Sequence, residues 1–104
     1  MLDVIIHKNG FIPGWLPAND LAMLLTTIQA SKSKRYVEIG TYMGKSAAAV
    51  SSLPQVQQVV SIDIFDPKFI WREHVAPELM PQTPEAFMRI AKDHIEKYGH
   101  SEKV

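Results

Sequence analysis

Apolar residues recur along the chain with a helical period in two places. One lies between residues 17 and 31, where four of them occupy the i, i+3, i+4 and i+7 positions of a single face: Leu21, Leu24, Leu25 and Ile28. Pro17, together with Asn19 or Asp20, supplies start signals for this helix. We expect its apolar face to lie on a sheet.

The second helical pattern follows Thr83, which is a good N-cap residue, and Pro84, which suits the first helical position. Its stripe contains Phe87, Ile90, Ala91, His94, Ile95 and Tyr98. Gly99 suits the end of the helix. His94 shares the apolar stripe, so we interpret it as a packing residue, and we expect the helix to cover one face of the sheet.

Between the helices, two short β-favouring runs enclose a segment rich in small residues. The first run is Tyr36, Val37 and Ile39, and it stops at Gly40; the second is Val59, Val60 and Ile62. The intervening helix, from about residue 44 to 53, is rich in alanine and can lie close to a sheet. A βαβ unit of about 30 residues permits a parallel crossover, so both strands would end at the same edge.

The two remaining segments have no clear period. Residues 1–16 begin with an apolar run and a Lys-Asn-Gly turn signal, which predict a short extended piece closed by a turn. Residues 68–82 are interrupted by Pro77 and Pro81 and predict a loop with at most one short helical turn.

Residues able to bind a ligand gather where both predicted strands end. Ligands of open α/β sheets bind beyond the carboxyl ends of the strands, and here those ends carry Glu38, Gly40 and Asp63. Gly40 permits a sharp turn, and Gly44 permits a close approach of the backbone to a ligand or to the sheet. Asp63 lies 23 residues after Gly40, the spacing at which dinucleotide-binding folds place a carboxylate on ribose. Both glycines could instead serve the turn alone, and Asp63 could cap the next segment.

The glycine turn does not match the phosphate-binding patterns. A dinucleotide fingerprint needs G-x-G-x-x-G, and a P-loop needs four residues before Gly-Lys-Ser, whereas only three residues separate Gly40 from Gly44. Glu38 would also repel a polyphosphate. The turn therefore favours a cationic ligand, and a nucleotide-binding P-loop is an alternative only if the shorter turn is tolerated.

The sequence VEIGTYMGKS followed by VVSIDIFDP resembles motifs I and II of class I S-adenosylmethionine-dependent methyltransferases, and most closely their small-molecule O-methyltransferase-like subgroup. This resemblance implies a truncated Rossmann-like α/β fold, a three-layer unit with at least two parallel strands and three helices. It implies that the first acid and the glycines line the methionine part of S-adenosylmethionine and that the second acid binds its ribose. The cofactor-binding residues would be Glu38, Gly40, Thr41, Tyr42, Gly44, Ser46, Asp63 and Ile64. Trp15, in a matching Gly-Trp-Leu segment, could cover the site or simply pack within its loop. Ile64 or Phe65 could pack on the adenine or form a hydrophobic plug.

The resemblance covers only the N-terminal half of the family's fold. A complete class I fold has seven strands, and its acceptor site and most of its catalytic residues come from later ones, so we assign no catalytic residue. Two parallel strands would leave free edges, which a homo-oligomer, a complementing chain or a larger assembly would cover. The expected function is cofactor binding in an incomplete methyltransferase for a small-molecule acceptor; the alternative is a non-catalytic assembly or interaction protein that reuses the same core.

Composition narrows the possible partners. The 104 residues include 11 Lys and Arg and 11 Asp and Glu, and this balance disfavours binding to nucleic acid or to anionic membranes. The absence of cysteine excludes disulfides and thiol chemistry and fits a cytoplasmic location. No zinc pattern is present, so we expect no metal site. We expect one domain, with an N-terminal segment and first helix in 1–34, the cofactor-binding βαβ unit in 35–66, and a loop and last helix in 67–104.

Overall fold

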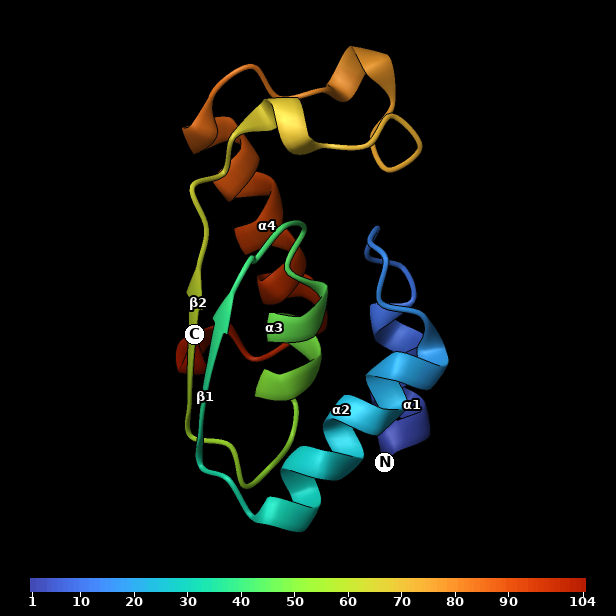
Figure 1. Ribbon diagram of the computed structural model, residues 1–104, viewed down its shortest axis with the longest axis vertical. Coiled ribbons are helices and arrows are strands. Elements are labelled where there is room, and N and C mark those ends of the chain that lie inside the picture. The colour runs from blue at the N-terminus through green and yellow to red at the C-terminus, as the bar shows by residue number, and fades with distance from the viewer.

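The computed structural model describes residues 1–104 and is a small α/β unit with four α-helices and a two-stranded sheet (Figure 1). Its elements are α1 (Leu2–Asn9), α2 (Ala18–Ser31), β1 (Arg35–Ile39), α3 (Lys45–Ser51), β2 (Gln58–Ile62) and α4 (Pro84–Tyr98). Short 3₁₀ turns cover 67–69, 77–79 and 101–103. None of the helices has the length and apolar character needed to cross a membrane.

The predicted βαβ unit is confirmed. Strands β1 and β2 pair in parallel, with Glu38 opposite Ser61 and Ile39 opposite Ile62. The Gly40 amide continues the pairing by donating to the Ile62 carbonyl at 2.7 Å. Both strands therefore end at the upper edge of the sheet in Figure 1, below the loop that contains residues 67–82.

The prediction for the N-terminus is wrong, because residues 2–9 form helix α1 and not an extended piece. Ile5 and Asn9, four residues apart, are buried on the same face, and the Asn9 side-chain amide donates to the Ile5 carbonyl at 2.8 Å. The β-branched residues of this run suggested a strand, but packing against α2 and α3 determines the helix.

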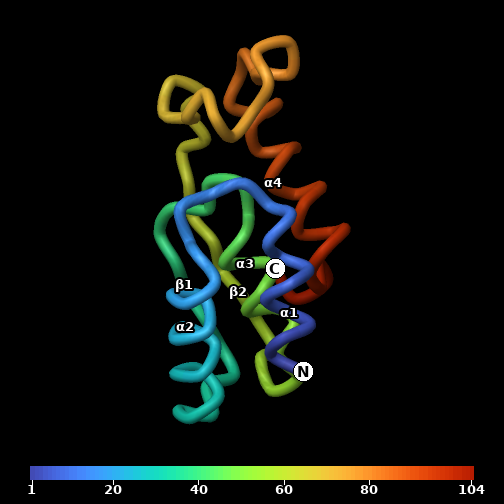
Figure 2. The backbone as a smooth tube through the Cα atoms, turned by 90° about the vertical axis from the view of Figure 1, so that its right-hand side faces the viewer, coloured from blue at the N-terminus to red at the C-terminus, as the bar shows by residue number.

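Helix α3 is the centre of the molecule, between the strands and α1 (Figures 1 and 2). Its residues Ala47, Ala48, Ala49 and Val50 have no exposed surface. The buried stripe of α2 packs on α1 and α3, and α4 packs mainly on α3. The apolar stripes of α2 and α4 were expected to pack on the sheet. Instead α3, with its small side chains, packs on the sheet, and α2 and α4 pack on α3.

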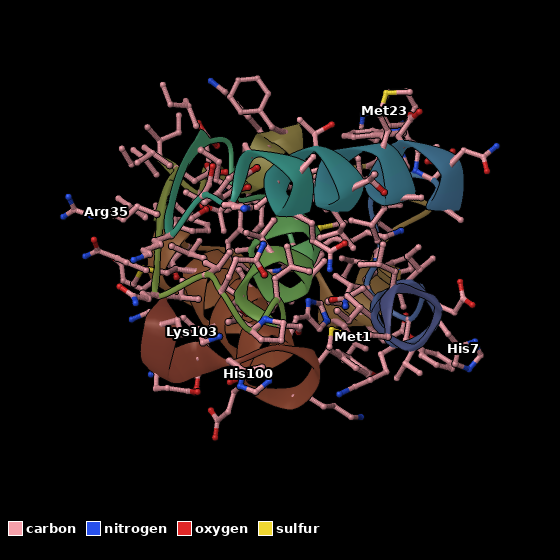
Figure 3. All side chains as sticks on the ribbon, turned by 90° about the horizontal axis from the view of Figure 1, so that it is seen from below. Met1, His7, Met23, Arg35, His100 and Lys103 are labelled. Carbon is pink, nitrogen blue, oxygen red and sulfur yellow. The ribbon has the colours of Figure 1, made fainter.

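All four helices lie on one side of the sheet, so helices do not cover both of its faces as they would in the expected three-layer unit (Figures 1 and 3). The inner face carries Tyr36, Glu38, Val59 and Ser61, which are half-buried or buried. The outer face carries four apolar side chains with exposed fractions between 40% and 89%: Val37, Ile39, Val60 and Ile62. We call these four residues the outer sheet face.

The capping residues of α4 act as predicted. The Thr83 hydroxyl accepts a hydrogen bond from the Ala86 amide at 3.1 Å, Pro84 occupies the first turn and Gly99 follows the last residue. His94 is a packing residue, as expected: its Nδ1 lies 2.7 Å from the Met43 carbonyl oxygen. Because a carbonyl can only accept, Nδ1 carries the proton. Helix α4 thereby holds the turn that follows β1.

Candidate functional site

A cavity of about 530 Å³ opens at the carboxyl edge of the sheet. Its walls come from the end of β1, the turn before α3, residues 13–16 and the end of β2. Six of the eight residues predicted to bind a cofactor line it: Glu38, Gly40, Thr41, Tyr42, Ser46 and Asp63. Segments far apart in the sequence therefore form one site, as expected from the parallel strand pair.

Glu38 is the centre of a hydrogen-bond network inside this cavity. Its Oε1 accepts from the Ser46 hydroxyl at 2.5 Å and from the Tyr36 hydroxyl at 3.1 Å, while Oε2 accepts from the Ser61 hydroxyl at 2.5 Å. The hydroxyls of Thr41 and Ser61 are 2.6 Å apart. Three neutral donors therefore hold the carboxylate in one orientation, and its negative charge is not cancelled by any cation within ion-pair distance.

Tyr36 contributes to this network as a permanent donor. Burial raises the pKa of its hydroxyl above the ordinary value of 10.0, and the negative charge of Glu38 raises the pKa further. The phenol is thus protonated at neutral pH and donates its hydrogen bond to Glu38.

Asp63 joins the ends of the two strands. Its Oδ2 accepts from the Tyr42 amide at 2.9 Å, and its Oδ1 accepts from the Phe65 amide at 2.8 Å. Tyr42 and Phe65 both have positive φ, 49° and 53°, a conformation that costs free energy for residues other than glycine. Asp63 therefore stabilises two strained turns, so the capping role considered from the sequence is present. Each oxygen keeps a further lone pair that could face a ligand.

The two glycines of the turn have different roles. Gly40, with φ of 100°, lines the cavity, and a Cβ placed on it would meet nothing within 4 Å. Gly44, with φ of 89°, lies outside the cavity, and a Cβ there would come within 2.9 Å of the Ala91 carbonyl oxygen. Gly40 thus leaves room for a ligand, whereas Gly44 permits the contact between α3 and α4.

The two hydrophobic residues that follow β2, Ile64 and Phe65, do not line the cavity. Ile64 is 74% exposed and lies outside the cavity. Phe65 packs edge-on against Phe87, with ring centroids 5.4 Å apart. Phe69, from the following 3₁₀ turn, lines the cavity instead.

An aromatic cluster, formed by Trp15, Tyr42, Trp71 and His74, stands beside the cavity. Trp15 lines the cavity and stacks on Tyr42 at a centroid distance of 5.3 Å. The Tyr42 oxygen accepts from the Trp71 amide at 3.1 Å and lies 2.6 Å from Nδ1 of His74. Either the Tyr42 hydroxyl or Nδ1 of His74 donates in this contact, according to the tautomer of His74. The sequence did not reveal this cluster, because its members come from three loops and share no motif.

A second hollow, of about 830 Å³, lies between the free edge of β2, helix α4 and residues 101–104. None of the eight predicted site residues lines it. The structure contains no group of three or more histidine, aspartate and glutamate side chains that could hold a metal ion.

No protein-family model matches the chain, and no curated protein and no solved structure is significantly similar to it. Fold and geometry are therefore the observations on which a function can be argued.

Proposed function

We propose that the cavity at the carboxyl edge of the sheet binds S-adenosylmethionine, as the cofactor site of the N-terminal portion of a methyltransferase. The observation that carries the proposal is the convergence of Glu38 and Asp63, from adjacent parallel strands, on one cavity beside the open space at Gly40. This cofactor carries a sulfonium, an ammonium and a ribose diol, and it has no phosphate. Two carboxylates suit these groups and would repel a polyphosphate.

Each carboxylate has a separate role in this proposal. Glu38 is held by three hydroxyls, so its charge attracts the cationic methionine part without needing to move. Asp63 is held by two backbone amides and offers its remaining lone pairs to the ribose hydroxyls. We assign the adenine to Phe69, a residue that is 61% exposed and lines the cavity, in place of Ile64.

Methyl transfer would need elements beyond these 104 residues. An acceptor must be held in line with the sulfonium, and in the family that the sequence resembles the acceptor site comes from later strands. The outer sheet face and the free edge of β2 are surfaces that further strands or a complementing chain could cover. We propose that the chain acts on a small-molecule acceptor only together with such a partner.

Calorimetric titration with S-adenosylhomocysteine tests the cofactor site. We expect wild-type protein to bind and Asp63→Asn, which keeps the shape of the side chain, to bind about tenfold or more weakly, because hydrogen bonds to a charged group contribute about 1.5–3 kcal/mol. Asp93→Asn, on the exposed side of α4, is the matched control and should bind as wild type. Absence of binding to a wild-type sample with an intact circular dichroism spectrum would refute the proposal.

The outer sheet face favours a second candidate function, a non-catalytic assembly protein. Parallel sheets are normally covered on both faces, and here one face is open and apolar. This function predicts a stable oligomer or hetero-complex in analytical ultracentrifugation and no response to S-adenosylhomocysteine. A protein that binds the nucleoside would favour the first proposal over this one.

A further inference from the structure

Lys45 is the only cationic residue that lines the cavity. It is the first residue of α3, and its side-chain Cδ lies 3.8 Å from the position that a Cβ on Gly14 would take. The aliphatic part of the side chain therefore runs along the loop that contains Trp15. A lysine in the first turn of a helix is electrostatically unfavourable, because the free amides there are also positive. The position in the helix therefore does not stabilise the charge of Lys45.

Comparison with the other lysines shows that Lys45 is unusual. The chain has eight, and six of them are exposed: Lys8, Lys32, Lys34, Lys68, Lys92 and Lys97. The two half-buried ones are Lys45 and Lys103. Lys103 donates to the Leu53 carbonyl at 3.1 Å, whereas the Lys45 ammonium has no acceptor and no carboxylate within ion-pair distance. Burial lowers the pKa of Lys45, as expected for an ammonium that has lost part of its hydration without gaining a partner.

The cavity is therefore lined by one cationic side chain, Lys45, and by two carboxylates, Glu38 and Asp63. Glu38 and Lys45 both line it, yet they form no ion pair with each other. Glu38 is directed by Tyr36, Ser46 and Ser61, so it does not turn toward the lysine. Two separated, opposite charges are complementary to an α-amino acid, which carries both an ammonium and a carboxylate.

We infer that Lys45 binds the carboxylate of the amino-acid part of the cofactor, while Glu38 attracts the ammonium. This inference rests on the proposed function and gives it a specificity: the site distinguishes a nucleoside that carries an amino acid from one that does not. Lys45 is then a binding residue for the methionine moiety and has no role toward the adenine or the ribose.

Two ligands separate these contributions. S-adenosylhomocysteine carries the amino acid, and 5′-methylthioadenosine has the same thioether nucleoside without it. We expect Lys45→Met, which keeps the length of the side chain and removes the charge, to weaken binding of S-adenosylhomocysteine by about tenfold or more. Binding of 5′-methylthioadenosine should change less than twofold. Lys45→Arg should retain most of the affinity for S-adenosylhomocysteine, and Lys92→Met, at an exposed position of α4, is the control for loss of a surface charge.

The outcomes distinguish this inference from the proposed function. If Lys45→Met leaves binding of S-adenosylhomocysteine unchanged, or weakens both ligands equally, the carboxylate assignment is overturned and the cofactor site itself stands. If folded wild-type protein binds neither ligand, the proposed function fails and the inference fails with it. Thermal melting of each variant by circular dichroism separates loss of binding from loss of fold.

Discussion

Glu38 illustrates, at the scale of single residues, how a charge is accommodated on the inner face of a sheet. A half-buried carboxylate facing helices is costly unless hydrogen bonds replace its hydration. Here Tyr36 and Ser61 provide donors from the strands, and Ser46 provides one from α3. The glutamate and its partners thus form one network across three elements, and the removal of any donor should affect stability.

Ser61→Ala tests this network. The substitution removes the donor to Glu38 Oε2 and the partner of Thr41, so we expect the free energy of unfolding to fall by about 1–3 kcal/mol. Ser101→Ala, at an exposed position without side-chain hydrogen bonds, should have little effect. Urea titration followed by circular dichroism provides the measurement. Equal stability of the two variants would show that the network contributes nothing.

The raised pKa of Tyr36 predicts a loss of stability at alkaline pH. Its pKa is raised in the folded state, so above the ordinary value of 10.0 the unfolded chain loses the phenolic proton while the folded chain keeps it. The unfolded state then binds fewer protons, and the free energy of unfolding falls as pH rises above 10. The decrease should be smaller in Tyr36→Phe. Urea titrations of the wild type and of Tyr36→Phe between pH 9 and 11 measure the difference. Equal losses of stability in the two proteins would contradict the prediction.

At the scale of elements, packing on α3 explains most of the architecture. Its alanines allow α4 and α1 to approach closely, and Gly99 lies so near that a Cβ on it would be 2.7 Å from the Ala48 carbonyl oxygen. The lengths of β1, β2, α2 and α4 were largely predictable, because periodicity and capping residues are local signals. Helix α1 was not, since its composition favours a strand and its packing partners lie later in the chain.

The two glycines of the turn give a prediction at this scale. Both have positive φ, so alanine at either position should cost about 1–2 kcal/mol of backbone strain. Gly44→Ala should cost about 1–3 kcal/mol more, because the new Cβ would overlap the backbone of α4. Thermal or urea unfolding of the two variants measures the difference. A Gly40→Ala variant that is as unstable as Gly44→Ala would contradict the two roles.

The whole molecule is asymmetric, because helices cover one face of the sheet and leave the other apolar face open (Figure 3). Its extents of 40 × 22 × 20 Å reflect this arrangement, with the loop of residues 67–82 extending beyond the strands (Figure 1). Parallel strands rarely remain uncovered, so the outer sheet face is the surface on which we expect association.

Association through this face can be tested with two substitutions. Val37→Thr and Val60→Thr together keep β-branched side chains and make the outer sheet face more polar. We expect wild-type protein to sediment as an oligomer at micromolar concentration and the double variant to dissociate toward monomer, with a change in unfolding free energy within about 0.5 kcal/mol after dissociation. Thr26→Val and Thr27→Val, at exposed positions of α2, serve as a control. Wild-type protein that sediments as a monomer would refute the prediction.

Much of the candidate site could be predicted because a parallel βαβ unit places the ends of both strands at one edge. Glu38 and Asp63 could therefore be assigned to the same site from their positions in the sequence, and the cavity contains both. Gly44 and Ile64 were assigned by the same motifs, yet one packs on α4 and the other faces outward. A motif specifies the backbone path but not the direction of every side chain along it.

The amino-acid sequence by itself determined the parallel strand pair, the two amphipathic helices and the carboxylates at the strand ends. These features depend on periodicity, turn residues and spacing, which act over a few residues. Only the tertiary structure decided that the helices share one side of the sheet, that α1 is helical, and that Trp15, Tyr42 and His74 meet beside the cavity. Such arrangements depend on which surfaces bury one another, and that is settled by contacts between residues far apart in the chain.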